Sequence, residues 1–557
     1  MGRPPRWREA VAVTALAAAV AALMTYPAIL NLEEAGRVDS PDGRWAIWNV
    51  AWVAHALTTD PAGLYQTNIF HPYSDTLVFA EANLVAGLLA VPAYLATGSA
   101  FVAHNSVLLI AFMLSFIGMY ALARSLTDSP AASIAPAIAF ACCPYIFARV
   151  PHISLQLMGG LPLSLLALHR LVDQRTIGRA VTLGGVLATQ ALATGYYGIF
   201  AGLSVGLGVL FFGITRGLWR ERAYWVTCAG AAAVAILLVL PFFLPYIELQ
   251  RDTGFARSLD EARSYSADWR AYFASSAWAH RWMLPLLESW REVLFPGFLI
   301  TIGAAVGSWT VVTRGTRSQR EIGIFYALVT ALAVWLSFGP RAGLYTVLYE
   351  TLPVMSLIRA PARAAVLVPL SLAMLTALGL TVLGSGWNRQ RRQVVGAAAA
   401  ILVTAELVEL PIQWYPAPDA SQAYRLLGQL PDGPVLELPF YDAEDGFEWH
   451  TGYLLASTRH WKSIVNGYGD FFPTQFVADA PVLAGFPSPE SFARIEQLDV
   501  RYVLVHFDLR GSPERSEWAT RIEPYRSTPW MPCTRVPMLP STRSLGRRGN
   551  LSPAPER

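Results

Sequence analysis

Charged residues are scarce in this chain. Asp, Glu, Lys and Arg together make up only 15% of its 557 residues, whereas apolar residues make up 54%. A soluble core cannot bury so many apolar runs of membrane-spanning length, which excludes a soluble globular protein. The basic residues are nearly all arginine, and Lys462 is the only lysine. The net charge of +3 is small and gives no support for a nucleic-acid partner.

Cysteine and the common catalytic motifs are scarce as well. The four cysteines, Cys142, Cys143, Cys228 and Cys533, form no CxxC or zinc-type spacing, so they predict neither a disulfide framework nor a structural metal. The chain also has no P-loop, no GxGxxG after a strand, no GxSxG nucleophile elbow and no HExxH. The enzyme classes that these motifs mark therefore have no support.

Apolar runs of spanning length dominate the first 412 residues. Twelve of them lie near residues 11–30, 81–97, 104–123, 131–148, 155–171, 179–194, 196–214, 224–246, 296–313, 321–338, 364–384 and 393–412. Arginine clusters occupy alternate loops from residue 170 onward, near 170–179, 216–222, 314–320 and 389–392. The positive-inside rule places all four clusters in the cytoplasm.

This charge pattern decides how many runs cross the membrane. His152 must then lie outside, which allows only two crossings between the first external loop and His152, although three apolar runs lie there. The run at 81–97 is short and contains Glu81 and Pro92. It is therefore predicted to be a membrane-surface or half-inserted helix. Eleven spans remain, with the N-terminus in the cytoplasm and the C-terminal region outside the bacterial inner membrane.

The sequence thus predicts an all-α polytopic membrane protein with about eleven transmembrane helices in residues 1–412. Its first external loop, with surface helices, covers 31–103, and its second large external loop covers 247–295. The apolar runs stop after residue 412, so residues 413–540 are predicted to form an extracytoplasmic domain. Residues 541–557 are rich in Ser, Arg, Pro and Gly and are predicted to be disordered.

The domain that follows the membrane module carries both strand and helix patterns. Residues 435–438 and 501–506 are short β-like runs, and a helix is predicted over 489–498 between them. A helix followed by a buried strand is typical of a small α/β unit.

An acidic turn directly follows the first predicted span. Ser40-Pro41-Asp42-Gly43 leads into an amphipathic stretch that contains Trp45, Trp48 and Trp52. This pattern predicts a loop that an aromatic belt holds at the outer membrane surface, where lipid-linked substrates present their head groups. The competing interpretation is that Asp42 is only a turn residue or a cap of the helix that follows.

The order of these loops resembles the GT-C fold of integral-membrane glycosyltransferases, which include oligosaccharyltransferases, protein O-mannosyltransferases and aminoarabinose transferases. Within roughly residues 1–410, four stretches are similar to bacterial membrane proteins that are grouped with polyprenyl-phosphate sugar transferases: Asp42 to Trp52, Asn68 to Pro72, Glu81, and Val150 to His152. The chain departs from the family pattern in two places. Gly43 follows Asp42 where a second acid is usual, and His152 stands where many relatives carry Asp-x-Asp.

The resemblance implies specific roles for three side chains. An acceptor hydroxyl must lose its proton as it attacks C1 of the sugar, and Asp42 is suited to be the general base. The leaving lipid phosphate needs guanidinium groups, and Arg359 and Arg363, four residues apart, would share one face of a helix. The alternative for the two arginines is that they only anchor a helix at the membrane interface.

A second tier of candidates follows from the same resemblance. Glu81 is a second catalytic candidate, and Asp42, Glu81 and His152 together offer oxygen and nitrogen ligands for a divalent cation such as Mg²⁺ or Mn²⁺. The interfacial alternative stays open for these residues, because three ligands on three loops form no spacing motif. Candidate site-lining residues are Asp39, His71, His152 and Tyr265.

The expected function is transfer of a sugar from a polyprenyl-phosphate donor to a glycan, lipid or protein acceptor outside the inner membrane, by direct displacement. The loop 257–268, which contains Tyr265, is interpreted either as a lid that orders on binding or as an ordinary surface helix. The leading alternative is a non-catalytic membrane protein of the same fold that acts as a transporter or scaffold in envelope polysaccharide assembly. The spans hold few ionisable residues, which favours surface chemistry over transport.

Overall fold

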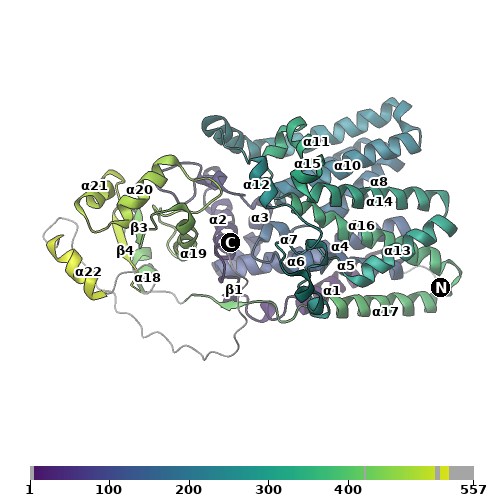
Figure 1. Ribbon diagram of the computed structural model, residues 1–557, viewed down its shortest axis with the longest axis horizontal. Coiled ribbons are helices and arrows are strands. Elements are labelled where there is room, and N and C mark those ends of the chain that lie inside the picture. The colour runs from purple at the N-terminus through teal and green to yellow at the C-terminus, as the bar shows by residue number, and fades with distance from the viewer. Residues whose placement is uncertain (1–5, 419–421, 508–514, 526–557) are drawn as a thin grey trace.

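The computed structural model describes residues 6–418, 422–507 and 515–525, and most of these residues are helical (Figure 1). Eleven helices within these ranges form a bundle that makes up one half of the molecule. They are α1 (Arg6–Met24), α4 (Ala100–Thr127), α5 (Pro130–Ala141), α8 (Gly160–Asp173), α9 (Ile177–Ala193), α10 (Gly195–Thr215), α11 (Arg222–Thr253), α13 (Phe298–Arg314), α14 (Arg317–Ser337), α16 (Leu367–Leu383) and α17 (Arg389–Leu407). The prediction of an all-α polytopic module is confirmed.

Not every helix of the bundle is long and apolar enough to cross a membrane. Seven segments in the described residues meet that condition: α1, α4, residues 130–147, α10, α11, α14 and residues 361–386. The helices α9 and α13 are apolar but shorter, α8 has 14 residues, and α17 begins with an arginine-rich turn. The predicted surface helix is α3 (Leu84–Thr97), which is also apolar and short. The count of eleven crossings stays a prediction.

Further helices gather at one end of the bundle, between it and the C-terminal domain (Figure 1). They are α2 (Pro41–Thr59), α3, α6 (Pro144–Phe147), α7 (Ile153–Gln156), α12 (Leu259–Ser264) and α15 (Leu344–Thr351). The helix α11 continues to Thr253, beyond the predicted start of the second large loop at 247, so that loop begins at residue 254. The loops that the sequence predicts to face outward therefore lie together at one end of the bundle.

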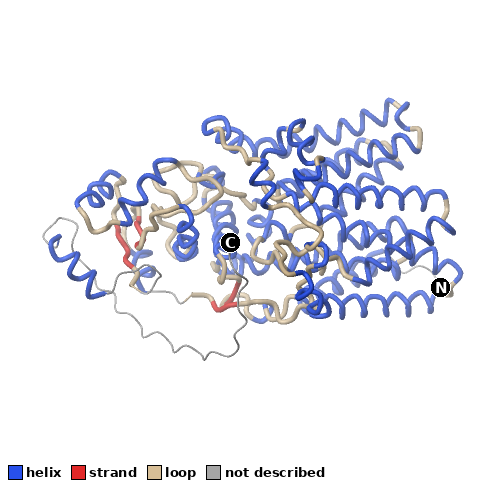
Figure 2. The backbone as a smooth tube through the Cα atoms, in the orientation of Figure 1, coloured by secondary structure: helices blue, strands red, loops and turns tan. Residues whose placement is uncertain are grey.

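The C-terminal domain carries most of the strand in the structure (Figure 2). Its helices and strands are α18 (Gln422–Gln429), β3 (Val435–Leu438), α19 (Thr451–Ser457), α20 (Thr474–Ala484), α21 (Pro489–Gln497), β4 (Tyr502–Val505) and α22 (Arg515–Ile522). The strands β3 and β4 pair in parallel, with Val435 opposite Tyr502. The predicted α/β unit, with a helix between two strands, is confirmed. The predicted disordered tail, 541–557, lies outside the described residues.

Backbone pairing joins the start of this domain to the first loop of the bundle. The strand β1 (Ala35–Gly36) pairs antiparallel with β2 (Tyr415–Pro416), and the amide of Ala417 donates to the carbonyl of Glu34 over 2.7 Å. These contacts fix where the C-terminal domain begins relative to the acidic turn at Asp42.

The tryptophans of α2 do not form the predicted belt at the membrane. Trp48 is only 1% exposed, and its Nε1 donates to Oδ1 of Asn68 over 3.2 Å. Trp52 packs edge-on against Trp461 of the C-terminal domain, with ring centroids 5.6 Å apart. Both rings belong to the hydrophobic core that α2 shares with this domain. An apolar helix face was correctly predicted, but protein rather than lipid covers it.

Close backbone contact between α13 and α16 depends on glycine, and we expect Gly379→Ala to destabilise the bundle. A Cβ at position 379 would lie 2.3 Å from the Cα of Gly307, so the two helices would have to move apart. Overpacking of this kind costs about 1–3 kcal/mol. The melting temperature of the detergent-purified protein should fall measurably.

The matched control is Gly202→Ala in α10. A Cβ at that position meets nothing within 4 Å, so the melting temperature should stay the same or rise slightly. Equal melting temperatures for the two variants would contradict the close packing of α13 against α16.

Candidate active site

The N-terminus of α2 holds Asp42 in place. The Oγ of Ser40 caps the helix by accepting a hydrogen bond from the amide of Gly43 over 3.2 Å, and Pro41 occupies the first turn. Asp42 therefore lies in the first turn, where the helix dipole favours a carboxylate. Gly43 is required here, because a Cβ would lie 1.8 Å from the carbonyl oxygen of Arg37.

His152 faces Asp42 from the opposite side of the site. It is the residue directly before α7, and its Nε2 lies 3.3 Å from Oδ2 of Asp42. The buried Nδ1 of His152 has no hydrogen-bond partner among the described residues. Within the same ranges, Oδ1 of Asp42 also has no protein partner. Asp42 thus keeps one carboxylate oxygen available, and its side chain is 47% exposed.

Two arginines lie beside this pair, each supported by an aromatic ring. The guanidinium of Arg363 lies 4.3 Å from the ring centre of Tyr196. It makes no hydrogen bond or ion pair within the part of the chain that the structure describes. The guanidinium of Arg359 lies 4.9 Å from the ring of Tyr265, and the amide of Arg359 donates to the hydroxyl of Tyr196 over 3.1 Å. These aromatic contacts hold the two cations in place.

The sequence pattern predicted that Arg359 and Arg363 share one face of an α-helix. The structure does not show this arrangement. Arg359 lies in a loop, and Arg363 lies in the 3-10 helix that runs from Pro361 to Val366 and leads into α16. Pro361 explains the difference, because the residue before a proline is biased away from the α-helical conformation. The loop nevertheless brings both cations close to Asp42.

The surroundings of Asp42 lower its pKa. Burial of the carboxyl group raises the pKa, but the hydrogen bonding and charge of His152, followed by the charges of the two arginines, lower it by more. The net pKa of Asp42 lies below the ordinary value for an aspartate. Asp42 is therefore an anion throughout the neutral range.

Glu81 lies beside the N-terminus of α10 and near Arg363. Its Oε1 accepts a hydrogen bond from the amide of Gly195 over 2.9 Å, which satisfies one of the free amides of that helix. The charge of Glu81 also acts on Arg363. Glu81 thus holds the start of α10, which carries Tyr196, against the site. Its predicted catalytic role stays a prediction.

Of the other predicted site residues, only Tyr265 contacts one of the two arginines beside Asp42. Tyr265 is part of the group through Arg359. Asp39 pairs with Arg37, with Nε and Oδ1 2.8 Å apart. The Nε2 of His71 lies 3.0 Å from the carbonyl oxygen of Leu498, so this ring contacts the C-terminal domain instead. The structure does not bring Asp39 or His71 into contact with Arg359 or Arg363.

Sequence reasoning missed several residues at the site. Asp470 of the C-terminal domain contacts both Arg257 and Arg359. Tyr196 contacts both Arg359 and Arg363. The buried Arg149 pairs with Glu292 and lies 3.8 Å from the ring centre of Tyr145. A tyrosine or a loop charge gives no periodic signal, so no sequence pattern marks these residues.

The side chains present do not fit a divalent metal site. Among the described residues, no three His, Cys, Asp or Glu side chains are placed to hold a metal ion. Of the three predicted ligands, Glu81 is bonded to the amide of Gly195, and Asp42 is next to His152 and two arginines. Those guanidinium groups repel a divalent cation at the same place.

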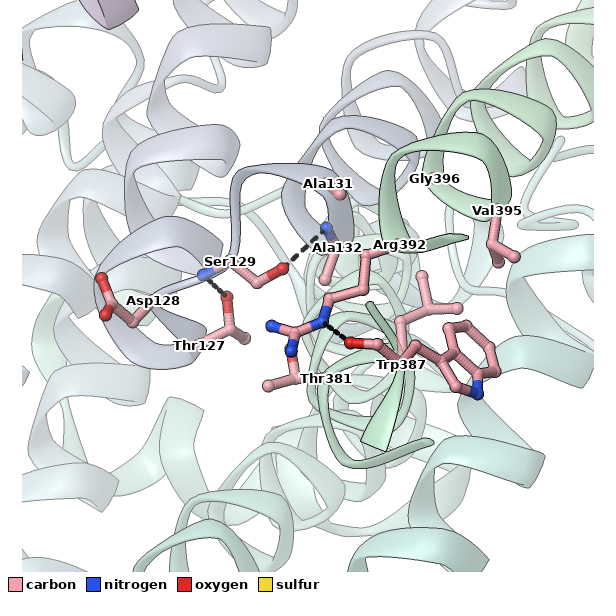
Figure 3. Close-up of a pocket in the computed structure, with 11 residues that line it drawn as sticks. Thr127, Asp128, Ser129, Ala131, Ala132, Thr381, Trp387, Arg392, Val395 and Gly396 are labelled. Atoms are coloured by element: carbon pink, nitrogen blue, oxygen red, sulfur yellow. Dashed lines mark hydrogen bonds between the residues drawn. The ribbon is translucent and has the colours of Figure 1, made fainter. Parts of the chain in front are cut away.

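A cavity of about 220 Å³ lies where α4 ends and α17 begins, at the other end of the bundle from α2 (Figure 1), and Figure 3 shows its lining. It is lined by the turn between α4 and α5, which includes Asp128 and Ser129, and by Trp387 and Arg392 at the start of α17. The Nε of Arg392 donates to the carbonyl of Trp387 over 3.0 Å. None of the residues placed around Asp42 lines this cavity.

Comparison with known proteins shows a likeness in fold. No family model and no curated protein sequence matches this chain. The apo oligosaccharyltransferase of Archaeoglobus fulgidus is similar, with a TM-score of 0.50 and 14% identity over 88% of this chain and 69% of that chain. Its complex with zinc and sulfate gives a TM-score of 0.50 and 14% identity over 89% and 68%. ArnT from Cupriavidus metallidurans bound to undecaprenyl phosphate gives 0.48 and 14% over 92% and 94%.

Proposed function

We propose that this protein, which has the GT-C membrane fold, transfers a sugar from a polyprenyl-phosphate donor to an extracytoplasmic acceptor. One observation carries the proposal: the Asp42 carboxylate, with a free Oδ1, lies near enough to Arg359 and Arg363, at one end of an apolar bundle, for their charges to lower its pKa. A base and an anion site thus lie side by side where a lipid head group would enter. The similar oligosaccharyltransferase of Archaeoglobus fulgidus supports the fold only.

The chemistry is a single displacement at C1 of the sugar. The acceptor hydroxyl oxygen forms a bond to C1 while the bond from C1 to the phosphate oxygen breaks. The hydroxyl proton passes to Oδ1 of Asp42, and the electron pair of the broken bond leaves with the lipid phosphate. Arg359 and Arg363 stabilise the charge that develops on this phosphate. A single displacement inverts the configuration at C1.

Donor binding strengthens Asp42 as a base. The charges of both arginines lower the pKa of Asp42 in the donor-free protein. A bound phosphate offsets those charges, so the pKa of Asp42 rises when the donor is present. The carboxylate therefore becomes a better proton acceptor at the moment when the acceptor needs it. His152 acts as a positioning residue, because its Nε2 holds Oδ2 and leaves Oδ1 for the acceptor.

No step in this mechanism uses a metal ion, because the donor set around Asp42 does not fit one. The two guanidinium groups supply the positive charge that a divalent cation would bring. We place the site and the C-terminal domain on the outer side of the bacterial inner membrane, with the N-terminus in the cytoplasm. The arginine clusters on alternate loops support this orientation. Glycans, lipids and proteins on that side are the candidate acceptors.

The test is sugar transfer by the purified full-length protein in liposomes. The donors are radiolabelled undecaprenyl-phosphate sugars supplied one at a time, and the acceptors come from a cell-envelope lysate. We expect transfer from one donor, absent from protein-free liposomes and unchanged in Asp60→Asn, an exposed acid at the far end of α2. Failure of every donor with folded protein would contradict the proposal and favour a transporter or scaffold.

The pH dependence of transfer should report the arginine charges. Because Arg359 lowers the pKa of Asp42, the Arg359→Gln variant should have a higher Asp42 pKa. Transfer falls as pH drops through that pKa, so the acid limb of the kcat/KM profile should move to higher pH in the variant. An acid limb that stays in place, or moves to lower pH, would show that Arg359 does not act on the titrating carboxyl.

A further inference from the structure

Asp470 places a carboxylate between two arginines of the candidate site. Its Oδ1 lies 2.8 Å from Nη2 of Arg257 and 3.3 Å from Nη1 of Arg359. One oxygen atom that two guanidinium groups share is the arrangement that an oxygen of a phosphate group would adopt. The two arginines are therefore already spaced to bind an oxyanion.

The two arginines are positioned independently of Asp470. The amide of Arg257 donates to the carbonyl of Ser356 over 2.9 Å, and its carbonyl accepts from the hydroxyl of Tyr349 over 2.8 Å. Its guanidinium rests on the ring of Phe255 at 4.9 Å and also pairs with Glu261, with Nη1 and Oε1 2.9 Å apart. Arg359 is held by the two tyrosines described above. These contacts come from the bundle end alone, so the arginine pair can persist when Asp470 leaves.

Asp470 belongs to a different part of the chain. It lies in the C-terminal domain just before α20, and its amide donates to the carbonyl of Phe79 over 2.7 Å. The ring of the next residue, Phe471, packs against Phe79 and Phe255. The Asp470 side chain is 41% exposed, so water weakens its ion pairs. The phosphodiester of the donor carries one negative charge, as this carboxylate does, and its two unesterified oxygens can each reach a guanidinium group, so it can replace Asp470.

We propose that Arg257 and Arg359 form a clamp for the phosphate of the lipid donor, and that Asp470 occupies this clamp until the donor arrives. This inference rests on the proposed function, because it assigns part of the donor site. Arg257 thereby becomes a third phosphate-binding arginine beside Arg359 and Arg363. Phosphate and Asp470 repel each other and cannot share the clamp, so donor binding releases this contact of the C-terminal domain.

The competing explanation is that Asp470 only fastens the C-terminal domain to the bundle. The two explanations differ in what Asp470→Asn does to phosphate binding. Under the proposal, the variant loses a competing anion and binds the phosphate about fivefold more tightly. Under a purely structural role, affinity stays the same or falls because the domain loosens.

The experiment titrates undecaprenyl phosphate into full-length protein in nanodiscs and measures the bound fraction by native mass spectrometry. Undecaprenol, which has the same chain and no phosphate, is the matched lipid. Inorganic phosphate, titrated by calorimetry, shows whether the clamp recognises the phosphate without the chain. We expect tighter binding of phosphate ligands by Asp470→Asn, about tenfold weaker binding by Arg257→Gln, and no change for undecaprenol.

Two further variants separate binding from folding. Asp470→Glu keeps the charge and should bind like the wild type, and Asp60→Asn removes an exposed acid elsewhere and should also change nothing. Melting temperatures show whether each variant is folded. If Asp470→Asn is too unstable to titrate, Arg257→Lys replaces it. A lysine offers one point charge in place of a planar fork, so the proposal requires weaker binding of undecaprenyl phosphate.

Two results would overturn the clamp: unchanged or weaker phosphate binding by Asp470→Asn, or unchanged binding by Arg257→Gln. The outcome for the proposed function is separate. Phosphate binding that responds to both variants, together with no sugar transfer from any donor, would keep the clamp and reject the transferase. Normal sugar transfer by the wild type, together with unaltered phosphate binding by Asp470→Asn, would keep the transferase and reject the clamp.

Discussion

Sugar transfer by the Asp42→Asn variant is expected to be about a thousandfold slower than by the wild type, because general-base catalysis contributes about 10²–10⁴ to rate. The amide has the size of the carboxylate but cannot accept the acceptor proton. The loss should appear in kcat, since Asp42 does not hold the donor phosphate in the proposed mechanism. The measurement is single-turnover transfer in liposomes with the donor that the wild type uses.

Two neighbouring acids show whether the effect belongs to Asp42. Asp39→Asn alters the other acid of the same turn, which is already paired with Arg37. Asp60→Asn alters an exposed acid at the end of the same helix. Both should transfer at the wild-type rate, and all variants should melt at similar temperatures. A wild-type rate for Asp42→Asn would remove Asp42 as the base, and a loss in Asp39→Asn would transfer that role to Asp39.

Arg363→Gln should lower kcat/KM for transfer about a hundredfold, as expected when one preorganised donor to a developing anion is removed. The Arg363 guanidinium rests on Tyr196 and has no ion-pair partner among the described residues, so its charge is available to the leaving phosphate. Arg363→Lys should recover part of the rate, because a lysine keeps the charge but loses the planar fork. Steady-state transfer at several donor concentrations measures both variants.

Arg341→Gln is the control for this prediction. Arg341 lies between α14 and α16, as Arg363 does, is exposed, and occupies the short 3-10 helix Gly339–Ala342. Its replacement changes the net charge equally and should leave transfer unchanged. Equal losses in the two variants would show a general effect of surface charge and would contradict a specific role for Arg363.

Sequence alone anticipated part of this site. Hydropathy and the alternation of arginine clusters placed Asp42, His152 and Arg359 on the same side of the membrane, and the structure gathers them at one end of the bundle. The side of the membrane stays a prediction, but a shared end of the bundle could be predicted because span length and charge are local properties of the chain. The contacts between these residues depend on how the loops pack, and no local pattern records that packing.

The contact between Asp470 and Arg257 could not be predicted from the sequence, because it joins distant parts of the chain. Asp470 and Arg257 are separated by more than two hundred positions, and their contact arises only because the C-terminal domain lies against the bundle end. The tryptophans of α2 illustrate the same limit. An apolar helix face predicts that something covers it, but the pattern is identical whether the cover is lipid or protein. Trp48 and Trp52 are covered by protein.

The hydrophobic core shared by α2 and the C-terminal domain also constrains the order of events during biosynthesis. Trp48 and Phe70 lie in this core with Leu438 and Phe440, which the ribosome adds almost four hundred residues later. At about 5–20 residues per second, Leu438 follows Trp48 by roughly 20–80 s. During that interval the bundle can be inserted and packed, while the aromatic face of the first loop has no partner. The contact of Asp470 with Arg257 and Arg359 therefore forms only after the C-terminal domain has been synthesised and has packed against the bundle.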